Sequence, residues 1–308
     1  MAKKSRKQRQ PAETAEGAVG PRQPCPCGSG LRYKNCHGSA GGPRLVKRPF
    51  EGLAGEADVI AMRELVPAAT ATLTLLEGDR EVRLATLLPM AAPAMVRESG
   101  AIWLGLQVQH SYGDPARDLG AVLEAALATE EPGIVGLTSA PGPGKRLQDL
   151  VSNTTLDVTV HEGFAYWIDD VERDAAMEAA LEQANEAAMP TERLASVDSA
   201  YWTNVGTKEH LRWVMAEDED TLLDALARLR AAGKDTLIDE GRLVGYFRAH
   251  GLVVPVWDLP VGTGAAALEE PAAAFKAALD EALAATEDLT SEERSARQGL
   301  VNRQVTIR

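Results

Sequence analysis

Three segments in the first half of the chain alternate polar and hydrophobic residues with a period of two. Residues 70–75 interleave threonine with alanine and leucine, and residues 81–84 interleave charged residues with valine and leucine. Residues 102–108 place an aliphatic side chain at every second position. This period is typical of half-buried strands. A turn signal at Gly78-Asp79 predicts that the first two strands form a hairpin.

Hairpin signals recur in the second half of the chain. Residues 156–168 alternate around a turn at Glu162-Gly163, which predicts a second hairpin. Residues 242–257 leave two alternatives open. They form either a hairpin that turns at His250-Gly251, or a short helix followed by an edge strand that tolerates Pro255.

Helical patterns lie between these strands. Residues 116–129 follow an Asp-Pro start signal, and residues 174–189 form an Ala/Glu-rich segment that ends at a proline. A further helix is predicted to begin at Asp218 or Asp220, either of which can cap it, and to end at Gly233.

The C-terminal residues are also predicted to be helical. Pro271 fits the first turn of a helix, and Thr290 with Glu293 forms a capping box. The mixture of hairpins and helices predicts an α+β or α/β body with mixed sheet and helix. Residues 101–130 and 210–233 both read as a strand followed by a helix, which suggests two similar lobes.

Charge is distributed unevenly along the 308 residues, whose net charge is −13. Residues 1–48 contain eleven Lys and Arg but two Glu, a net charge of +9, so residues 49–308 carry −22. A basic arm on an acidic body favours contact with nucleic acid, an anionic membrane surface or an acidic protein through the arm alone. The same composition also fits a solubilising tail that binds nothing.

The three cysteines of the chain lie close together near its N-terminus. Cys25 and Cys27 are two positions apart, Cys36 follows after eight intervening residues, and His37 is adjacent to it. Three thiolates and one imidazole make a tetrahedral zinc site, and Gly28-Ser29-Gly30 permits the chain reversal that brings them together. Four protein ligands leave no position for water, so the sequence predicts a structural zinc ion rather than a catalytic one.

The segment 24–38 resembles the SEC-C motif, the zinc-binding element found at the C-terminus of the preprotein-translocase motor SecA and attached to many unrelated proteins. The resemblance rests on the Cys-Pro-Cys-Gly-Ser-Gly core, the Tyr-Lys pair and the Cys-His-Gly end. It implies the metal ligands Cys25, Cys27, Cys36 and His37. It also implies that a basic and aromatic surface contacts the chaperone SecB, ribosomes or acidic lipid through Arg32, Tyr33 and Lys34.

The whole layout, with this motif ahead of an α/β body, also resembles an actinobacterial family of unknown function, and this likeness brings no activity with it. We expect six parts along the chain. They are a basic disordered arm (1–23), the zinc-binding module (24–38), a flexible linker (39–49), a first lobe (50–150), a second lobe (151–264) and a C-terminal helical segment (265–308).

Other short motifs in the body lack residues that the corresponding binding or catalytic sites require. Gly262-Thr263-Gly264 imitates a dinucleotide fingerprint, but a helix rather than a strand is predicted to follow it. His110, Ser111 and Asp114 suggest a Ser-His-Asp set, but no Gly-x-Ser-x-Gly is present there. The best remaining sign of an anion site is a basic cluster of Lys208, His210 and Arg212.

Compartment signals favour the cytoplasm. No apolar run reaches the roughly 18–20 residues that cross a bilayer. The basic N-terminus is followed by a polar segment that begins at Gln10-Pro11, where a secretory signal would be apolar.

Two functions remain open. The first is a cytoplasmic zinc-binding interaction or adaptor protein whose motif docks on a ribosome, a chaperone or another acidic protein, in an oligomeric state that the sequence leaves open. The second is an enzyme of unknown reaction in the body, with the zinc module used for targeting, and it requires a pocket with convergent polar groups. Nucleic-acid binding through the arm is less favoured because the body carries −22.

Overall fold

The computed structural model describes residues 19–20, 22–23, 32–33, 45–168 and 175–303. The chain divides into two compact units, Met1–Lys47 and Arg48–Arg308, and the helices and strands named below lie in the second. Within the described residues, no helix combines the length and the apolar character needed to cross a lipid bilayer.

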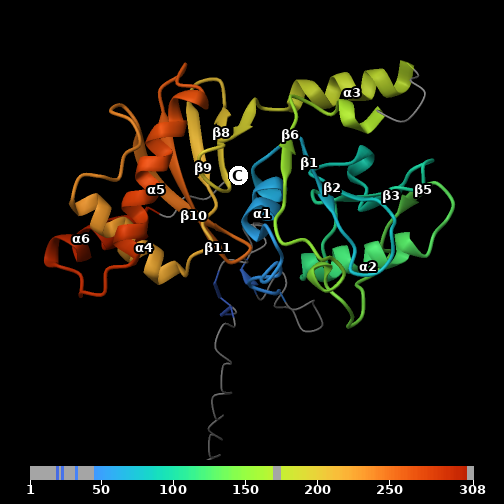
Figure 1. Cartoon of the computed structure of the whole chain (residues 1–308), viewed down its shortest axis with the longest axis horizontal. Coiled ribbons are helices and arrows are strands. Elements are labelled where there is room, and N and C mark those ends of the chain that lie inside the picture. Colours follow the sequence, from blue (N-terminus) through green and yellow to red (C-terminus); the bar gives the residue numbers. More distant parts are fainter. Residues whose placement is uncertain (1–18, 21, 24–31, 34–44, 169–174, 304–308) are drawn as a thin grey trace, which may run out of the picture. The chain divides into compact units, whose positions relative to one another are not determined.

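The first sheet of the second unit is mixed. Its strands run in the order β5-β3-β4-β2-β1-β6, and neighbouring strands are antiparallel except for β2 and β4 (Figure 1). Among the described residues these strands are β1 (Ala69–Leu73), β2 (Val82–Ala85), β3 (Ala94–Val96), β4 (Ile102–Gly105), β5 (Gly133–Val135) and β6 (Val158–Val160).

Helices cover both faces of this sheet. Two α-helices, α1 (Glu56–Glu64) and α2 (Pro115–Leu127), pack on one face, and their apolar side chains join those of the strands in one cluster. The 3-10 helix η4 (Ala165–Ile168) and α3 (Ala175–Ala187) pack on the other face, around Trp103. Two short 3-10 helices, η2 (Pro89–Ala91) and η3 (Leu147–Asp149), lie in the connections.

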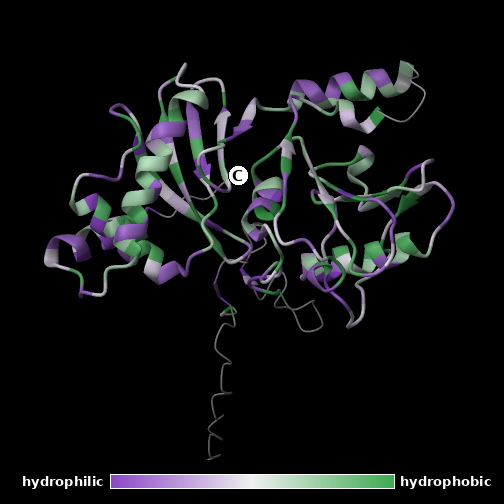
Figure 2. Cartoon of the chain, viewed as in Figure 1, coloured by the Kyte–Doolittle hydropathy of each residue, from purple (hydrophilic) through white to green (hydrophobic). Residues whose placement is uncertain are grey.

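The second sheet is antiparallel throughout, in the order β10-β11-β9-β8-β7. One face packs on three helices through a cluster that contains Trp202, Leu211 and Trp257. In Figure 2 these helices alternate hydrophilic and hydrophobic colours along their length, as expected of helices with one face on a sheet. The described elements are β7 (Thr191–Arg193), β8 (Ala200–Asn204), β9 (Glu209–Trp213), β10 (Arg242–Ala249), β11 (Leu252–Leu259), α4 (Glu219–Ala231), η5 (Ala266–Leu268), α5 (Glu269–Leu283) and α6 (Ser291–Val301).

The predicted α+β class is confirmed, and so are most of the predicted elements. Of the two alternatives for residues 242–257, the structure forms the hairpin β10–β11. His250 and Gly251 have φ angles of 45° and 91°, the left-handed conformation that a tight hairpin turn requires. Pro255 is tolerated because β11 pairs with β9 only over Val256–Leu259.

The predicted hairpin over residues 156–168 is wrong. Its first half is β6, which pairs with β1, and its second half is the helix η4. Burial explains the difference, because Tyr166 stacks against Trp103 with ring centroids 5.9 Å apart and donates a hydrogen bond to the carbonyl of Leu87 (2.9 Å). Residues 151–264 were assigned to the second lobe, but β6 lies in the first sheet.

The two sheets differ in topology, since one is mixed and the other antiparallel. The similarity predicted from the repeated pattern extends to the local order of a strand followed by a helix, α2 after β4 and α4 after β9. It does not extend to the strand order of the sheets.

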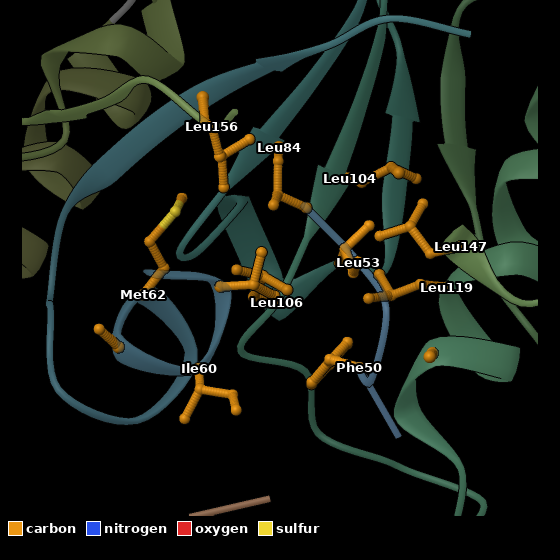
Figure 3. Close-up of a cluster of buried hydrophobic side chains, with 14 of the residues drawn as sticks. Phe50, Leu53, Ile60, Met62, Leu84, Leu104, Leu106, Leu119, Leu147 and Leu156 are labelled. Atoms are coloured by element: carbon orange, nitrogen blue, oxygen red, sulfur yellow. The ribbon is translucent and has the colours of Figure 1, made fainter. Parts of the chain in front are cut away.

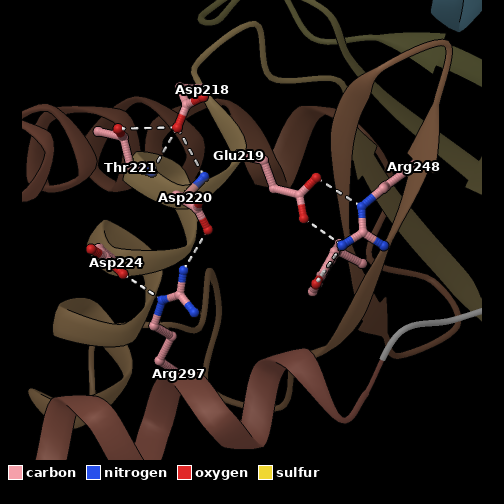
Figure 4. Close-up of polar contacts among 8 residues, drawn as sticks. Asp218, Glu219, Asp220, Thr221, Asp224, Arg248 and Arg297 are labelled. Atoms are coloured by element: carbon pink, nitrogen blue, oxygen red, sulfur yellow. Dashed lines mark hydrogen bonds and ion pairs between the residues drawn. The ribbon is translucent and has the colours of Figure 1, made fainter. Parts of the chain in front are cut away.

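The start of α4 settles which aspartate caps it (Figure 4). The carboxylate of Asp218 accepts hydrogen bonds from the backbone N–H groups of Asp220 (3.0 Å) and Thr221 (3.2 Å). Asp220 instead pairs with Arg297 of α6 at 2.7 Å, and Arg297 also contacts Asp224 at 2.5 Å. The two aspartates, which are two positions apart in the sequence, therefore have different roles: Asp218 caps α4, and Asp220 links α4 to α6 through Arg297.

The apolar cluster around α1 joins the two sheets. Figure 3 shows Ile60 and Met62 of α1 in one cluster with Leu84 and Leu104 of the first sheet. The same cluster includes residues of the second sheet, among them Tyr201, Phe247 and Val254. The helix thus contributes to the interior of both sheets at once.

A polar contact lies inside this junction. Asp58 of α1 is only 5% exposed, and its Oδ1 accepts a 2.6 Å hydrogen bond from the hydroxyl of Tyr201. Arg193 contributes Nε at 3.3 Å and Nη2 at 3.4 Å. Burial, followed by the nearby Asp58, raises the pKa of Tyr201 well above its ordinary value, so the phenol remains a hydrogen-bond donor.

We predict that Tyr201→Phe lowers the free energy of unfolding by about 1.5–3 kcal/mol, because a buried carboxylate loses one of its donors. Urea denaturation of the full-length protein measures this. The control is Tyr246→Phe, which removes a buried hydroxyl whose contact with Arg248 is long, at 3.5 Å. Equal losses in the two variants would show that the Asp58 contact contributes nothing particular.

Candidate functional site

The predicted zinc ligands lie outside the described residues. This holds for Cys25, Cys27, Cys36 and His37, and also for Lys34 of the predicted docking surface. The zinc site therefore stays a prediction from sequence. Elsewhere, in the residues that the structure does describe, no group of three or more His, Cys, Asp or Glu side chains is placed to hold a metal ion.

Four described residues lie beside or within the cysteine segment, at 22–23 and 32–33. The backbone N–H of Tyr33 donates to the carbonyl of Gln23 at 2.8 Å, which holds these two residues together. Gln23 in turn donates from its own N–H to the carbonyl of Gly20 at 3.0 Å. Of the predicted docking residues, Arg32 is exposed and Tyr33 is half-buried.

The loop that imitates a dinucleotide fingerprint uses its amides internally. The N–H groups of Gly262 and Gly264 donate to Glu209 Oε1 (2.6 Å) and Oε2 (2.9 Å), and the indole N–H of Trp202 also donates to Oε2 (2.8 Å). Burial of Glu209 opposes ionisation, but these three hydrogen bonds outweigh it and lower the pKa of the carboxyl group. The anion in this loop is the protein's own side chain.

Two residues of the basic cluster predicted as an anion site, Lys208 and His210, contact Asp258. Lys208 Nζ lies 2.6 Å from Asp258 Oδ2, and His210 Nδ1 lies 3.1 Å from Oδ1. Burial lowers the pKa of His210, which keeps its ring neutral near pH 7. Burial also lowers the pKa of Arg212. An external anion would have to compete with Asp258 for Lys208. The lysine of the predicted anion site therefore already has an anionic partner within the protein.

A cavity of about 330 Å³ opens beside the first sheet. It lies among η2, the end of β4, the N-terminal half of α2 and β5, and its volume is at the lower end of the range for small-molecule sites. Most of its walls are apolar, contributed by Met90, Pro93, Leu119, Val122, Ile134 and Leu137.

Arg63, in the last turn of α1, is one of two charged groups that line the cavity. Its Nη1 donates to the carbonyl of Leu106, while its buried Nε makes no hydrogen bond and lies 3.4 Å from Glu64 Oε1. Burial lowers the pKa of Arg63, because desolvation outweighs the attraction of Glu64 and Asp118.

Asp118 of α2 is the second charged group. Its Oδ2 accepts hydrogen bonds from the N–H of Tyr112 (2.8 Å) and the hydroxyl of Ser111 (3.1 Å). Burial raises the pKa of Asp118, and these hydrogen bonds oppose it only in part. No sequence motif relates Arg63 to Asp118, which are 55 positions apart. Neither residue was therefore predicted as a site residue from the sequence.

The Ser-His-Asp set suggested by the sequence does not form. Ser111 donates directly to Asp118, whereas Asp114 caps α2 and pairs with Arg146 at 2.8 Å. His110 lines the cavity as an exposed side chain. The cavity therefore offers a serine held by a carboxylate rather than one held by a histidine base.

Comparisons with known proteins cover both parts of the chain. The model described as "Family of unknown function (DUF5926)" matches residues 49–308, and that of the SEC-C motif matches residues 22–39. The protein translocase subunit SecA of Rubrobacter xylanophilus is 51% identical over 35 residues, which are 11% of this chain and 4% of that protein. No solved structure gives a significant match.

We predict that Glu209→Gln destabilises the protein by about 1.5–3 kcal/mol at pH 7, since an amide cannot replace a carboxylate that accepts three hydrogen bonds. The lowered pKa means that this stabilisation is fully present above the ordinary value of 4.5 and is lost as pH falls through the folded-state pKa. Urea denaturation from pH 7 to pH 3 should therefore show the wild type and the variant converging in acid. The exposed Glu240→Gln is the control, and a gap that stays constant with pH would contradict the prediction.

Proposed function

Because the chain belongs to DUF5926, a family of unknown function, and carries a SEC-C motif ahead of the family domain, we propose that it is a zinc-binding interaction protein of the cytoplasm. Its motif docks on a ribosome, a chaperone or another acidic protein. The observation that carries this proposal is the SEC-C match at residues 22–39, together with the similarity to SecA over 35 residues.

The donor set fits zinc. Cys25, Cys27, Cys36 and His37 supply three thiolates and one imidazole, the composition of structural zinc sites in which protein ligands fill the coordination sphere. The hydrogen bond between Tyr33 and Gln23 is consistent with a chain reversal that brings such ligands together. A module this short has almost no apolar core, so zinc would supply the free energy that orders it.

Charge supports docking through this end of the chain. The +9 of residues 1–48 attracts acidic surfaces that the −22 of residues 49–308 repels. The exposed side chain of Arg32 is available for such contact, with Tyr33 and Lys34 beside it in the sequence. An enzyme in the body is less well supported, because the serine at the cavity is bonded to Asp118 and not to a base.

We expect wild-type protein purified from metal-replete cells to contain one zinc ion per chain, and Cys36→Ser to lose it, as measured by inductively coupled plasma mass spectrometry. The five tryptophans lie at positions 103 and beyond, so their fluorescence reports on the body alone. Urea unfolding followed by this fluorescence should be unchanged in Cys36→Ser. Wild-type protein without zinc, or a variant that retains it, would overturn the metal assignment.

Crosslinking followed by quantitative mass spectrometry tests the docking role. Arg32→Glu/Lys34→Glu should reduce the recovery of acidic partners at least about tenfold, since two attractive charges become repulsive. The control, Lys234→Glu/Arg303→Glu, makes the same change in net charge at exposed positions of the body and should keep the wild-type partners. If the Arg32/Lys34 variant recovers every wild-type partner unchanged, the docking role is wrong.

A further inference from the structure

We propose that the cavity beside the first sheet binds a small zwitterion with an apolar side chain, that is, an apolar α-amino acid. Arg63 would receive its carboxylate, Asp118 its ammonium group, and the apolar wall its side chain. This inference rests on the body of the protein and is independent of the docking proposed for the SEC-C motif.

The charged pair is the first argument. Arg63 and Asp118 attract each other, yet their charged atoms do not approach within the 4.0 Å of an ion pair. Opposite charges held apart in apolar surroundings are best satisfied by a ligand that presents one group of each sign between them. A simple anion would meet repulsion from Asp118, and a simple cation would meet repulsion from Arg63.

Unused hydrogen-bonding capacity supports the same ligand. Nη1 of the guanidinium donates to the carbonyl of Leu106 and Nε lies near Glu64, whereas Nη2 has no acceptor within the described residues. On Asp118, Oδ2 accepts both hydrogen bonds, which leaves Oδ1 without a donor there. Burial lowers the pKa of Arg63 and raises that of Asp118, and a bound ligand of opposite charge at each would reverse both shifts.

The wall opposite these charges is apolar and is held in a strained shape. Met90 and Ala91 have φ angles of 59° and 51°, a left-handed conformation that is costly for residues other than glycine. Met90 is 73% exposed at the rim, and Ile134 is 49% exposed. Gly105 lets this segment approach, since a Cβ there would lie 2.4 Å from the carbonyl oxygen of Ala92. An apolar surface maintained at such cost fits an aliphatic ligand side chain.

Three matched probes test the ligand class on the full-length protein by isothermal titration calorimetry. They are L-leucine, 4-methylpentanoate, which lacks the ammonium group, and 3-methylbutylamine, which lacks the carboxylate. L-Leucine should bind at least about tenfold more tightly than either analogue, because only it satisfies both charges. If either analogue binds as tightly as leucine, or if none of the three binds with a Kd below about 10 mM, the proposal fails.

A pair of variants locates the site. Asp118→Asn keeps an oxygen acceptor for Tyr112 and Ser111 but removes the charge, and it should weaken leucine binding at least about tenfold. Asp114→Asn lies on the same helix, where asparagine also caps well, and should bind leucine as the wild type does. Equal binding by both variants would overturn the assignment.

Methyl NMR reports where in the protein the ligand binds. The methyl resonance of Met90 should shift when leucine is added, whereas that of the exposed Met189, which is not among the residues that line the cavity, should not. Leucine binding that leaves the Met90 signal in place would put the ligand elsewhere and contradict the proposal. A shift that persists unchanged in Asp118→Asn would contradict the role of the carboxylate.

Discussion

The carboxylate of Asp58 lies within the apolar cluster that joins the two sheets, where burial without partners would be costly. Tyr201 and Arg193, from β8 and β7, supply those partners across more than 130 positions of sequence. The contact is directional, whereas the surrounding apolar packing is not. It therefore specifies how α1 is oriented toward the second sheet, while the burial of Ile60, Met62 and their neighbours supplies most of the stabilisation.

Local patterns predicted the elements whose alternation, turn residues or capping residues can be read from neighbouring positions. The period of two at residues 70–75, the hairpin turn at His250-Gly251 and the capping box at Thr290 all recur in the structure. Helix α1 was missed because most of its residues are buried, which removes the one-sided pattern of a surface helix. The aromatic alternation of residues 164–168 is typical of a strand, but these residues form a 3-10 helix that packs against Trp103. No local pattern in the sequence records that distant packing partner.

The two candidate sites also differ in whether their residues are close together in the sequence. The cysteine segment can be read from sequence because its predicted ligands fall within thirteen consecutive positions, from Cys25 to His37. The cavity could not be read, since Arg63 and Asp118 come from different helices and only the packing of α1 and α2 on one sheet brings both to its lining. A charged residue on a helix is ordinarily solvated, and nothing local distinguishes these two from their neighbours.

The loop that carries Gly262 and Gly264 already has the backbone donors of an anion-binding site. Its amides already converge on negative charge, the arrangement by which glycine-rich loops hold phosphate, but Glu209 occupies them. Substitution of Glu209 by a short neutral side chain would leave the N–H groups of Gly262 and Gly264 without this acceptor. An affinity for phosphate esters would then arise in this loop through the loss of a carboxylate rather than through the building of a new pocket.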